Sequence, residues 1–598
     1  MNHIEFEAEC DAHRAERSVK SYSRMKSFLS EGQLAESSSL DMNLMILRNF
    51  TVEPLLTFLE VDSRILGLKP TFKLGNFDSI AQDSNSDLID FDKFDFLVIL
   101  QILETISPTL GSRYSESGKE SARSEIDRVV SLFRMYLTAI REKSNTPILL
   151  NTFPIPDFPG LGLADGRIGL GQIDAILELN SDIRKLSLQF QSVYVLDFFS
   201  ILARCGNAVG LDERMWTVAM NPFSPIGMIE ISKEISRTIK ALALPRKKCL
   251  ILDCDNVLWN GVTGEEGVKS MNLSLQRFAL DLRFSGVFIA LASKNNEQDV
   301  FEVLENDDRA ILRKEHLAAW EINWEDKAGN IRKIADSLNI GLDSVVFVDD
   351  SLFECNLVRE ILPEVKVLQF DGHESKFRKL VIESGLFDAL VITDEDRLKT
   401  SFSIDDLKRK ELRDRTSSLQ DYLDNLGVEV EIGFMRMENI ARISQLSKKT
   451  NQFNLTTERL DEADFHSFLL DPFKKVLYLR AKDKIADLGL VGSAILSFRE
   501  HYVFIDNLLL SCRALGRGIE KTFLSEIKRY AFESGYTKIV ARYIESTKNG
   551  QVAEYYRDNG FRIAEEFGKG YFEIDLKEGV DCGPAWIGVE FKSGGGEQ

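Results

Sequence analysis

Residues 250–261 read LILDCDNVLWNG, an apolar run that continues into two aspartates and ends on a glycine. The run is typical of a buried strand, and Asp253 and Asp255 stand two residues apart at its end. Side chains two positions apart in an extended chain point to the same side, so both carboxylates can face one Mg²⁺ ion or one phosphoryl group. Like charges this close raise each other's proton affinity unless a cation offsets them. The pair therefore indicates a site where one carboxylate attacks phosphorus and the other moves a proton.

Polar residues also follow the next predicted strands of this region. Ser293 ends the run FIALAS, where its hydroxyl and the start of the next helix can hold a phosphate oxygen. Lys327 begins a predicted helix, a place suited to steady developing negative charge. Asp349 and Asp350 end the run VVFV, and Glu354 follows as a further oxygen ligand for Mg²⁺. Each residue alone has an ordinary explanation as a helix cap or a surface charge, but together they stand where open α/β sheets bind ligands.

The composition excludes some classes of protein. The 598 residues are too many for one core and predict several domains. A net charge of −20 argues against nucleic-acid binding, because phosphate neutralisation needs a basic surface. The seven cysteines show no zinc-ligand spacing, the N-terminus lacks the apolar region of a secretory signal, and no apolar stretch is long enough to span a bilayer. We therefore expect a cytoplasmic protein without a membrane partner.

Apolar runs alternate with amphipathic segments, which predicts parallel sheets covered by helices and a multidomain α/β fold class. The candidate strands are LMILRNF, FDFLVILQIL, TPILLNTF, VYVLDFF, KKCLILDCD, SGVFIALASKNN and SVVFVDDS. A later region that starts at VEVEIGFMR mixes strands and helices. The predicted division is a polar helical leader (1–40), an α/β domain (41–243), a second α/β domain (244–395), a helical connector (396–427), an α+β domain (428–580) and a tail (581–598).

The second α/β domain resembles the haloacid dehalogenase superfamily of phosphatases and phosphotransferases. The resemblance implies a Rossmann-like domain in which Asp253 is the nucleophile and Asp255 the general acid and base. It implies that Mg²⁺ is held by four carboxylates: Asp253, Asp255, Asp349 and Asp350. It also implies a set of phosphate-binding residues, of which the last is catalytic: Ser293, Lys294 and Lys327. The interval between Asp255 and Ser293 is too short for a large cap domain, so we expect an open site that favours a bulky substrate or one presented by another protein or domain.

The segments DCDNVLWNGVTGEEG, SKNN and FVDDSLFE more specifically resemble the FkbH-like subfamily, and LRNFTVEP (47–54) extends the resemblance toward the start of the chain. FkbH-like proteins with glyceryltransferase activity take the glyceryl group of 1,3-bisphosphoglycerate, release phosphate, and load the acyl group onto an acyl carrier protein. The resemblance therefore implies a transferase of natural-product, polyketide or glycan biosynthesis. Its substrate would be an acyl phosphate and its partner an acyl carrier protein.

The stretch LLLSCRALGRG (508–518) predicts a strand followed by a glycine turn that opens a helix. Such a turn offers free backbone N–H groups to a pyrophosphate or to the phosphate of phosphopantetheine. Arg513, Arg517 and Lys521 are four residues apart, which predicts a cationic stripe on one face of the helix. A solvated helix start is the ordinary alternative.

The same region resembles the Gcn5-related N-acetyltransferase (GNAT) fold, whose acyl-CoA loop has an Arg/Gln-x-x-Gly-x-Gly/Ala pattern. The resemblance implies a set of residues that bind acetyl-CoA or phosphopantetheine: Arg513, Gly516, Arg517, Gly518, Asn549 and Tyr556. In the FkbH-like subfamily the SCRALGRG motif carries a cysteine, here Cys512. A thiol beside a helix N-terminus and two guanidinium groups is expected to ionise readily, which suggests Cys512 as the catalytic residue that carries a glyceryl thioester. A buried structural cysteine is the alternative.

The first α/β domain resembles, through the same subfamily, an SGNH-hydrolase-like flavodoxin fold. This chain has no Gly-Asp-Ser block there, and none of its six histidines lies within 41–243, so no Ser-His-Asp arrangement can be completed. Asn49, Thr51 and Asn151 remain as candidate ligand-binding residues. We expect a noncatalytic domain that shapes the open phosphatase-like site or docks a partner.

Three hypotheses stay open at the level of the sequence. The first is a glyceryltransferase that uses Mg²⁺ and an acyl phosphate. The second is a phosphatase fused to a CoA-dependent N-acetyltransferase. The third is a noncatalytic scaffold for a biosynthetic complex, against which the intact acids at 253, 255, 349 and 350 weigh.

Overall fold

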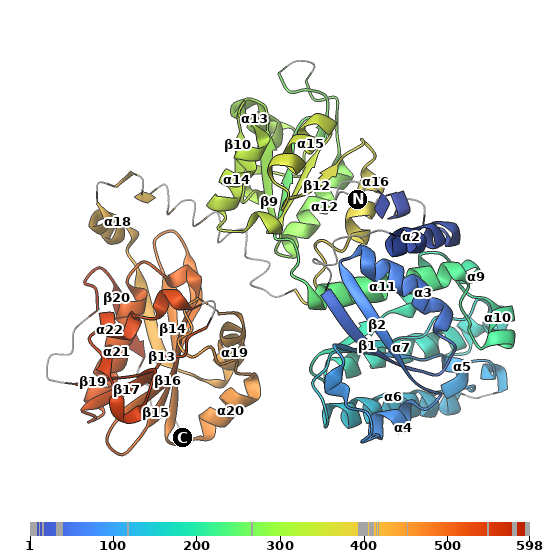
Figure 1. Cartoon of the computed structure of the whole chain (residues 1–598), viewed down its shortest axis with the longest axis horizontal. Coiled ribbons are helices and arrows are strands. Elements are labelled where there is room, and N and C mark those ends of the chain that lie inside the picture. Colours follow the sequence, from blue (N-terminus) through green and yellow to red (C-terminus); the bar gives the residue numbers. More distant parts are fainter. Residues whose placement is uncertain are drawn as a thin grey trace. The chain divides into compact units, whose positions relative to one another are not determined.

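The computed structural model divides the chain into two compact units, Met1–Arg397 and Leu398–Gln598 (Figure 1). It describes residues 9–10, 12–14, 17–31, 40–116, 119–264, 267–392, 405, 409, 412–413, 415–416, 418–450, 452–546, 549–576 and 583–592. Among these residues no helix combines the length and the apolar character that crossing a bilayer requires.

The first unit contains two parallel five-stranded sheets. The strand order of the first sheet is β2-β1-β3-β4-β5, the doubly wound order of flavodoxin-like folds. Its strands are β1 (Leu40–Arg48), β2 (Leu68–Phe77), β3 (Phe96–Leu100), β4 (Ile148–Asn151) and β5 (Val193–Leu196). The helices around it are α2 (Val19–Glu31), α3 (Glu53–Ile65), α4 (Ile80–Asn85), α5 (Leu103–Ile106), α6 (Lys119–Arg141), α7 (Gln172–Ser187), α8 (Phe198–Ala203), α9 (Asn207–Gly210), α10 (Glu213–Ala219) and α11 (Pro225–Ala243).

Strand β1 shows why this sheet is covered on both faces. Leu44 and Ile46 pack into a core with α2, α3 and α11, whereas Met45 and Leu47 pack on the opposite face with α6 and α7. Successive side chains of a strand point to opposite faces, so an unbroken apolar run needs helices on both sides.

The second sheet has the order β10-β9-β6-β11-β12. Its strands are β6 (Cys249–Leu252), β9 (Phe288–Ser293), β10 (Ala319–Ile322), β11 (Val345–Asp349) and β12 (Lys366–Gln369). Helices α12 (Leu273–Phe284), α13 (Glu297–Asn306) and α16 (Glu374–Glu383) pack on one face, and α14 (Lys327–Ser337) and α15 (Leu352–Ile361) on the other. A small antiparallel hairpin, β7 (Trp259–Asn260) and β8 (Ser270–Met271), follows β6. Strand β6 lies at the centre, with β9 and β11 on its two sides.

Buried ion pairs join α11, which packs on the first sheet, to the end of the second α/β domain. Lys233 binds Glu383 at 2.7 Å, and both side chains are 8% exposed. Arg237 forms a two-pronged pair with Asp388 at 2.7 and 2.8 Å. Removing one partner of a buried pair leaves an uncompensated charge, so these contacts favour one arrangement of α11 against α16.

The second unit contains one eight-stranded mixed sheet with the order β18-β19-β17-β16-β15-β14-β13-β20. Its strands are β13 (Glu429–Phe434), β14 (Lys474–Lys482), β15 (Asp487–Phe498), β16 (Val503–Leu510), β17 (Lys538–Arg542), β18 (Arg562–Ile563), β19 (Tyr571–Asp575) and β20 (Gly588–Lys592). Its helices are α18 (Leu419–Leu426), α19 (Ile440–Lys449), α20 (Glu462–Leu470), α21 (Ile519–Glu533) and α22 (Tyr555–Asp558). Helix α21 covers one face, and α19 and α20 cover the other.

The expected fold class is confirmed, since two parallel sheets are followed by a mixed sheet. Each of the seven quoted strand segments contains a strand. The strands that the sequence did not indicate in the first unit's sheets, β2, β10 and β12, are all at sheet edges. Edge strands are partly solvated, so their sequences, such as LKPTFKLGNF for β2, lack an unbroken apolar run.

The structure divides the chain only into the two units. The other predicted domain boundaries stay predictions. The units divide between residues 397 and 398, inside the predicted connector, much of which lies outside the described residues. The predicted tail (581–598) contains β20, which pairs in parallel with β13, so this part of it belongs to the sheet.

Candidate functional site

Three carboxylates meet at the carboxyl edge of the second sheet. Asp253 follows β6, and Asp349 and Asp350 stand at the end of the neighbouring β11. One oxygen of each lies within 4.8 Å of the other two. Asp253 and Asp349 are buried and Asp350 is half-buried. Because β6 and β11 are parallel neighbours, their carboxyl ends bring these side chains together.

Lys327 lies between two of these carboxylates. Its Nζ is 2.9 Å from Asp253 Oδ2, and it also forms an ion pair with Asp349. Burial alone would lower the pKa of Lys327, but the negative charges of Asp253 and Asp349 outweigh burial and hold that pKa above its ordinary value. The ammonium group is therefore charged at neutral pH and is placed to hold the oxygens of a phosphoryl group.

The three carboxylates have the donor chemistry that Mg²⁺ prefers, which is oxygen. Asp253 Oδ1 is buried and has no hydrogen-bond partner among the described residues. Burial and the negative charge of Asp253 raise the pKa of Asp349 to about 6, and the same two causes raise the pKa of Asp350. A divalent cation among these groups would offset their repulsion and satisfy the oxygen, so the residues fit Mg²⁺.

Asp255, expected as a fourth metal ligand, is not part of this carboxylate group. Its Oδ1 accepts hydrogen bonds from Trp259 Nε1 at 2.8 Å and from the N–H and hydroxyl of Thr263 at 3.1 and 2.8 Å. Its Oδ2 accepts a hydrogen bond from Asn295 Nδ2 at 3.0 Å. These hydrogen bonds orient the Asp255 carboxylate beside the group of three, and its expected roles as a metal ligand and in proton transfer stay predictions. Sequence reasoning missed the orienting roles of Trp259, Thr263 and Asn295, although all three stand in the quoted motifs.

The expected phosphate-binding residues after β9 have different surroundings. Ser293 is buried at the same sheet edge as Asp253, because β9 pairs with β6 in parallel. Lys294 forms an ion pair with Glu354 on α15 at 2.7 Å. Glu354 therefore neutralises a lysine and is not one of the three clustered carboxylates. Ser293 remains the better placed of the two expected residues for a phosphate oxygen.

The glycine turn of the second unit begins its helix later than expected. Cys512–Ala514 form a single 3₁₀ turn, and α21 begins at Ile519. Arg513 and Arg517 therefore precede the helix, and the predicted cationic stripe along one helix face is wrong. Gly516 and Gly518 have φ values of +75° and +88°, a conformation that glycine adopts without strain.

The surroundings of this turn are already occupied by other parts of the second unit. Arg517 Nη1 lies 3.6 Å from the buried carboxylate of Asp483. The carbonyl of Arg517 accepts a hydrogen bond from Trp586 Nε1 at 3.0 Å. A Cβ atom at Gly518 would lie 3.0 Å from Pro584. The segment that precedes β20 thus lies against the turn that was expected to bind a pyrophosphate.

The chain also fills the gap between two parallel strands of this unit. Strands β16 and β17 pair only from Val503 to Ile505 and from Ile539 to Ala541. Beyond this pairing, segment 453–455 lies between them: Leu510 N donates to Phe453 O at 2.9 Å, Leu455 N donates to Leu508 O at 3.1 Å, and Ile544 N donates to Leu455 O at 2.8 Å. The backbone groups at the gap are therefore bonded within the protein.

Asn549 and Tyr556, expected near a cofactor thiol, are both buried. Asn549 Nδ2 donates to the carbonyls of Asn454 at 3.0 Å and Ile544 at 2.9 Å, and its Oδ1 accepts from Ser546 N at 2.7 Å. The bond to Asn454 ties Asn549 to segment 453–455, and the other two tie it to the residues after β17. Burial raises the pKa of Tyr556, and its hydroxyl has no partner among the described residues.

The candidate ligand residues of the first domain fasten strand ends. Asn49 Oδ1 accepts from Ile102 N at 2.8 Å, and Asn151 Oδ1 accepts from Gln101 N at 2.7 Å. Asn151 Nδ2 also donates to Gln101 O at 2.8 Å. Both side chains are buried, so they tie the ends of β1 and β4 to the residues after β3. Thr51 is half-buried near the same edge.

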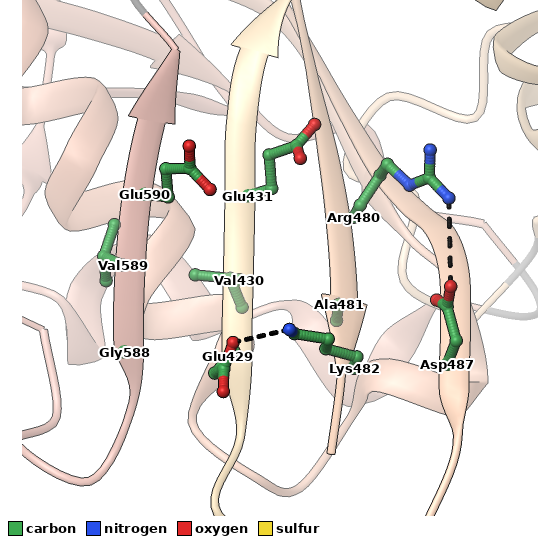
Figure 2. Close-up of a pocket in the computed structure, with 10 residues that line it drawn as sticks. All are labelled: Glu429, Val430, Glu431, Arg480, Ala481, Lys482, Asp487, Gly588, Val589 and Glu590. Carbon is green, nitrogen blue, oxygen red and sulfur yellow. Dashed lines mark ion pairs between the residues drawn. The ribbon is translucent and has the colours of Figure 1, made fainter. Parts of the chain in front are cut away.

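A hollow on the mixed sheet, shown in Figure 2, is lined by residues of β13, β14, β15 and β20. Two ion pairs cross it: Lys482 lies 2.8 Å from Glu429, and Arg480 lies 3.9 Å from Asp487. These two pairs neutralise its two basic residues, and Glu431 and Glu590 leave the lining with an acidic excess. It brings together none of the expected site residues.

Comparison with solved structures finds a fold likeness over a large part of the chain. The N-terminal part of the protein BF1531 from Bacteroides fragilis, which contains a phosphatase domain complexed with Mg, covers 62% of this chain and 99% of its own length. The identity is 22% and the TM-score 0.53. The likeness shows that this part of the chain shares the fold of that phosphatase-containing structure.

Two acetyltransferase structures match about a quarter of the chain. They are the ribosomal-protein-S18-alanine N-acetyltransferase of Escherichia coli (11% identity, 25% of this chain, 94% of that chain, TM-score 0.20) and the GNAT domain of S. lividans PAT (16% identity, 24% of this chain, 89% of that chain, TM-score 0.20). No family model and no curated protein matches this chain.

Proposed function

We propose that the first unit is a Mg²⁺-dependent phosphatase or phosphotransferase with Asp253 as nucleophile, joined to an acyltransferase domain in the second unit. The observation that carries the proposal is the meeting of Asp253, Lys327 and Asp349, with one oxygen of the nucleophile bound to lysine and the other without a partner among the described residues. The fold shared with a phosphatase-containing structure that binds Mg supports it.

In the proposed reaction, a carboxylate oxygen of Asp253 attacks the phosphorus of a phosphate ester. The bond from phosphorus to the leaving oxygen breaks, and Asp255 gives that oxygen a proton. Water then attacks the phosphorus of the aspartyl phosphate while Asp255 takes its proton, which releases phosphate and restores the carboxylate. Lys327 and Ser293 hold phosphoryl oxygens in both steps. Asp253, Asp349 and Asp350 would hold a Mg²⁺ ion, which would supply positive charge beside the phosphoryl group.

The finer proposal, based on the FkbH-like resemblance, is glyceryl transfer from 1,3-bisphosphoglycerate. That molecule contains an acyl phosphate as well as a phosphate ester. The thiolate of Cys512 attacks the acyl carbon, the bond from this carbon to the phosphate oxygen breaks, and phosphate leaves with the electron pair. The phosphopantetheine thiol of an acyl carrier protein then takes the glyceryl group from Cys512. The phosphatase site removes the remaining ester phosphate.

A CoA-dependent N-acetyltransferase in the second unit is the other candidate. The mixed sheet, with parallel strands β16 and β17 that separate, is of the fold class expected for GNAT enzymes, which favours it. Acetyl-CoA would then be the acyl donor. Segment 453–455 and the segment around Trp586 would have to move before a pantetheine arm could enter between the strands.

Intact-mass spectrometry with peptide mapping tests the proposal. The protein is incubated with Mg²⁺ and freshly generated 1,3-bisphosphoglycerate, and phosphate release is measured in parallel. We expect a glyceryl adduct on the peptide that contains Cys512. Cys512→Ala should lose the adduct and keep the release of phosphate from a phosphate ester. Cys205→Ala, at a half-buried free cysteine of the first unit, is the matched control and should keep both.

The other outcomes separate the hypotheses. Phosphate release from a protein that stays unmodified but binds acetyl-CoA would move the assignment to a phosphatase–acetyltransferase fusion. An adduct retained in Cys512→Ala would exclude the cysteine relay. A protein that neither binds Mg²⁺ nor releases phosphate contradicts the phosphatase proposal and favours the scaffold.

A further inference from the structure

The first domain contains a pocket of about 500 Å³ that the proposed chemistry does not use. It is formed by residues that follow β3 and β4, together with parts of α7, α9 and α10. The carboxyl ends of parallel strands are where α/β sheets bind ligands, and pockets of roughly 300–1,000 Å³ are usual for small molecules. The position and size therefore indicate a small-molecule site.

The walls of the pocket are fixed by internal hydrogen bonds. Gln172 Nε2 donates to the Gly111 carbonyl at 2.6 Å, and its Oε1 accepts from Gly160 N at 2.9 Å. Asn207 Nδ2 donates to the Ile155 carbonyl at 2.9 Å. The polar side chains that shape the pocket are thus engaged with the backbone, so the walls are formed before a ligand binds.

The interior of the pocket is apolar and aromatic. Phe223 is buried, Trp216 is half-buried, and Phe158 is 84% exposed. The indole of a tryptophan is the side chain that most strongly attracts a cation over its face. The aromatic lining therefore favours a ligand with an apolar body and accepts a positive charge.

The charged residues that line the pocket are all acidic: Glu104, Asp157, Asp212 and Glu213. Asp212 Oδ1 accepts a hydrogen bond from Met215 N at 2.9 Å, at the start of α10. No ion pair engages Glu104, Asp157 or Glu213 within the part of the chain that the structure describes. A ligand with a negative charge would be repelled here, whereas a cation would offset the carboxylates.

We propose that this pocket binds a small ligand that carries a protonated amine on an apolar or aromatic body. Apolar walls take up the body, and the carboxylates together with Trp216 take up the ammonium group. The proposal assigns a binding function to the domain that has no catalytic triad. It does not depend on the phosphatase or acyltransferase chemistry.

Isothermal titration calorimetry of the full chain with three ligands of one shape tests the proposal. The ligands are tryptamine, its neutral analogue tryptophol and its anionic analogue indole-3-acetate, at constant pH and ionic strength. We expect tryptamine to bind about tenfold more tightly than tryptophol, the amount expected for one desolvated cation contact, and indole-3-acetate to bind most weakly. Equal affinity for the amine and the alcohol, or no binding of tryptamine at millimolar concentration, would overturn the proposal.

Substitutions of single residues test whether the preference for tryptamine over tryptophol arises in this pocket. Glu104→Gln should weaken tryptamine binding about fivefold and leave tryptophol binding unchanged, since only a charge contact is lost. Glu142→Gln, at an exposed glutamate of the same domain outside the pocket, is the matched control and should change neither. Asp157→Asn repeats the test at a second carboxylate if Glu104→Gln does not fold. An equal loss in the control variant would show that only the overall negative charge attracts the amine, which also overturns the proposal.

Discussion

The carboxylate group of the first unit and the expected cofactor-binding region of the second differ in how their polar groups are engaged, although the buried Tyr556 hydroxyl of the second has no partner among the described residues. Asp253, Asp349 and Asp350 converge, and one buried oxygen among them has no partner in the described part of the chain. In the second unit, Asn549 is bonded to three backbone groups near segment 453–455, and Arg517 of the glycine turn lies beside a buried carboxylate.

This difference separates two kinds of evidence for function. Buried polar groups in proteins almost always have partners, so an unpartnered oxygen among convergent carboxylates indicates a ligand-binding site. Polar groups that are bonded within the protein indicate structural roles in this conformation. Both regions carry recognisable motifs, and only the surroundings of the side chains distinguish them.

The largest expected effect is at Asp253, the proposed nucleophile. Asp253→Asn keeps the size of the side chain and removes the attacking carboxylate, so phosphate release should fall by at least about a thousandfold. Release of inorganic phosphate in the presence of Mg²⁺ measures it. Asp336→Asn, at an exposed aspartate of α14, should leave the rate unchanged. Full activity in Asp253→Asn would contradict its assignment as the nucleophile. The difference drawn between the carboxylate group and the expected cofactor-binding region would then say nothing about function.

The next prediction separates proton transfer from metal binding. Asp255→Asn should lower phosphate release by about a hundredfold, because a general acid and base is lost. Its Mg²⁺ affinity should stay within about threefold of the original, since Asp255 lies outside the carboxylate group. Asp350→Asn should instead weaken Mg²⁺ binding by at least tenfold, roughly the effect of losing one carboxylate ligand. Calorimetric titration with Mg²⁺ distinguishes the two variants, and equal losses of affinity would restore Asp255 as a ligand.

Asn549→Ala tests the structural role assigned to the second region. It removes one buried hydrogen bond to segment 453–455, at Asn454, and two bonds to Ile544 and Ser546, so the free energy of unfolding of the second unit should fall by about 3 kcal/mol. Urea unfolding measures this loss, and phosphate release by the first unit should not change. If the variant kept its stability but lost acyl transfer, Asn549 would be a ligand-binding residue instead.

The pH dependence of Mg²⁺ binding follows from the raised pKa of Asp349, which is about 6 in the metal-free site. The folded metal-free protein holds this proton at a pH where the unfolded chain has released it, so its stability falls as the pH rises from about 4 to 6. Mg²⁺ must displace the same proton, so its affinity should be constant above pH 7 and fall about tenfold per pH unit below 6. Titration with Mg²⁺ from pH 5 to 8 measures this, and an affinity that does not vary with pH would contradict the burial of these acids.

The smallest expected effect is at Trp586, whose side chain lies against the glycine turn. Trp586→Ala removes the hydrogen bond to the Arg517 carbonyl and the ring beside Gly518. Affinity for acetyl-CoA or for a phosphopantetheine-bearing carrier should rise by about threefold to tenfold, because less internal contact must be broken on entry. Fluorescence titration measures it, with Trp324→Ala, at an exposed tryptophan of the first unit, as the control. A loss of affinity would mean that Trp586 contacts the ligand.

Much of the carboxylate site could be predicted from local sequence. Asp253, Ser293 and Asp349 each end an apolar run, and parallel strands place such ends at one edge. The orientation of Asp255 could not be predicted, because it depends on donors from the hairpin after β6 and from the loop after β9. The pairing of Lys294 with Glu354 is likewise set by two segments distant in sequence.

The sequence by itself determined the fold class, the central strands and the carboxylates at their ends. Central strands are buried on both faces, so their apolar runs are unbroken, and the connectivity of a parallel sheet fixes where they end. Only the tertiary structure decided the edge strands, the partners of the glycine turn and the pocket of the first domain. Each of these depends on contacts between residues far apart in the chain, whose side chains reach or leave a partner only once the whole unit has packed.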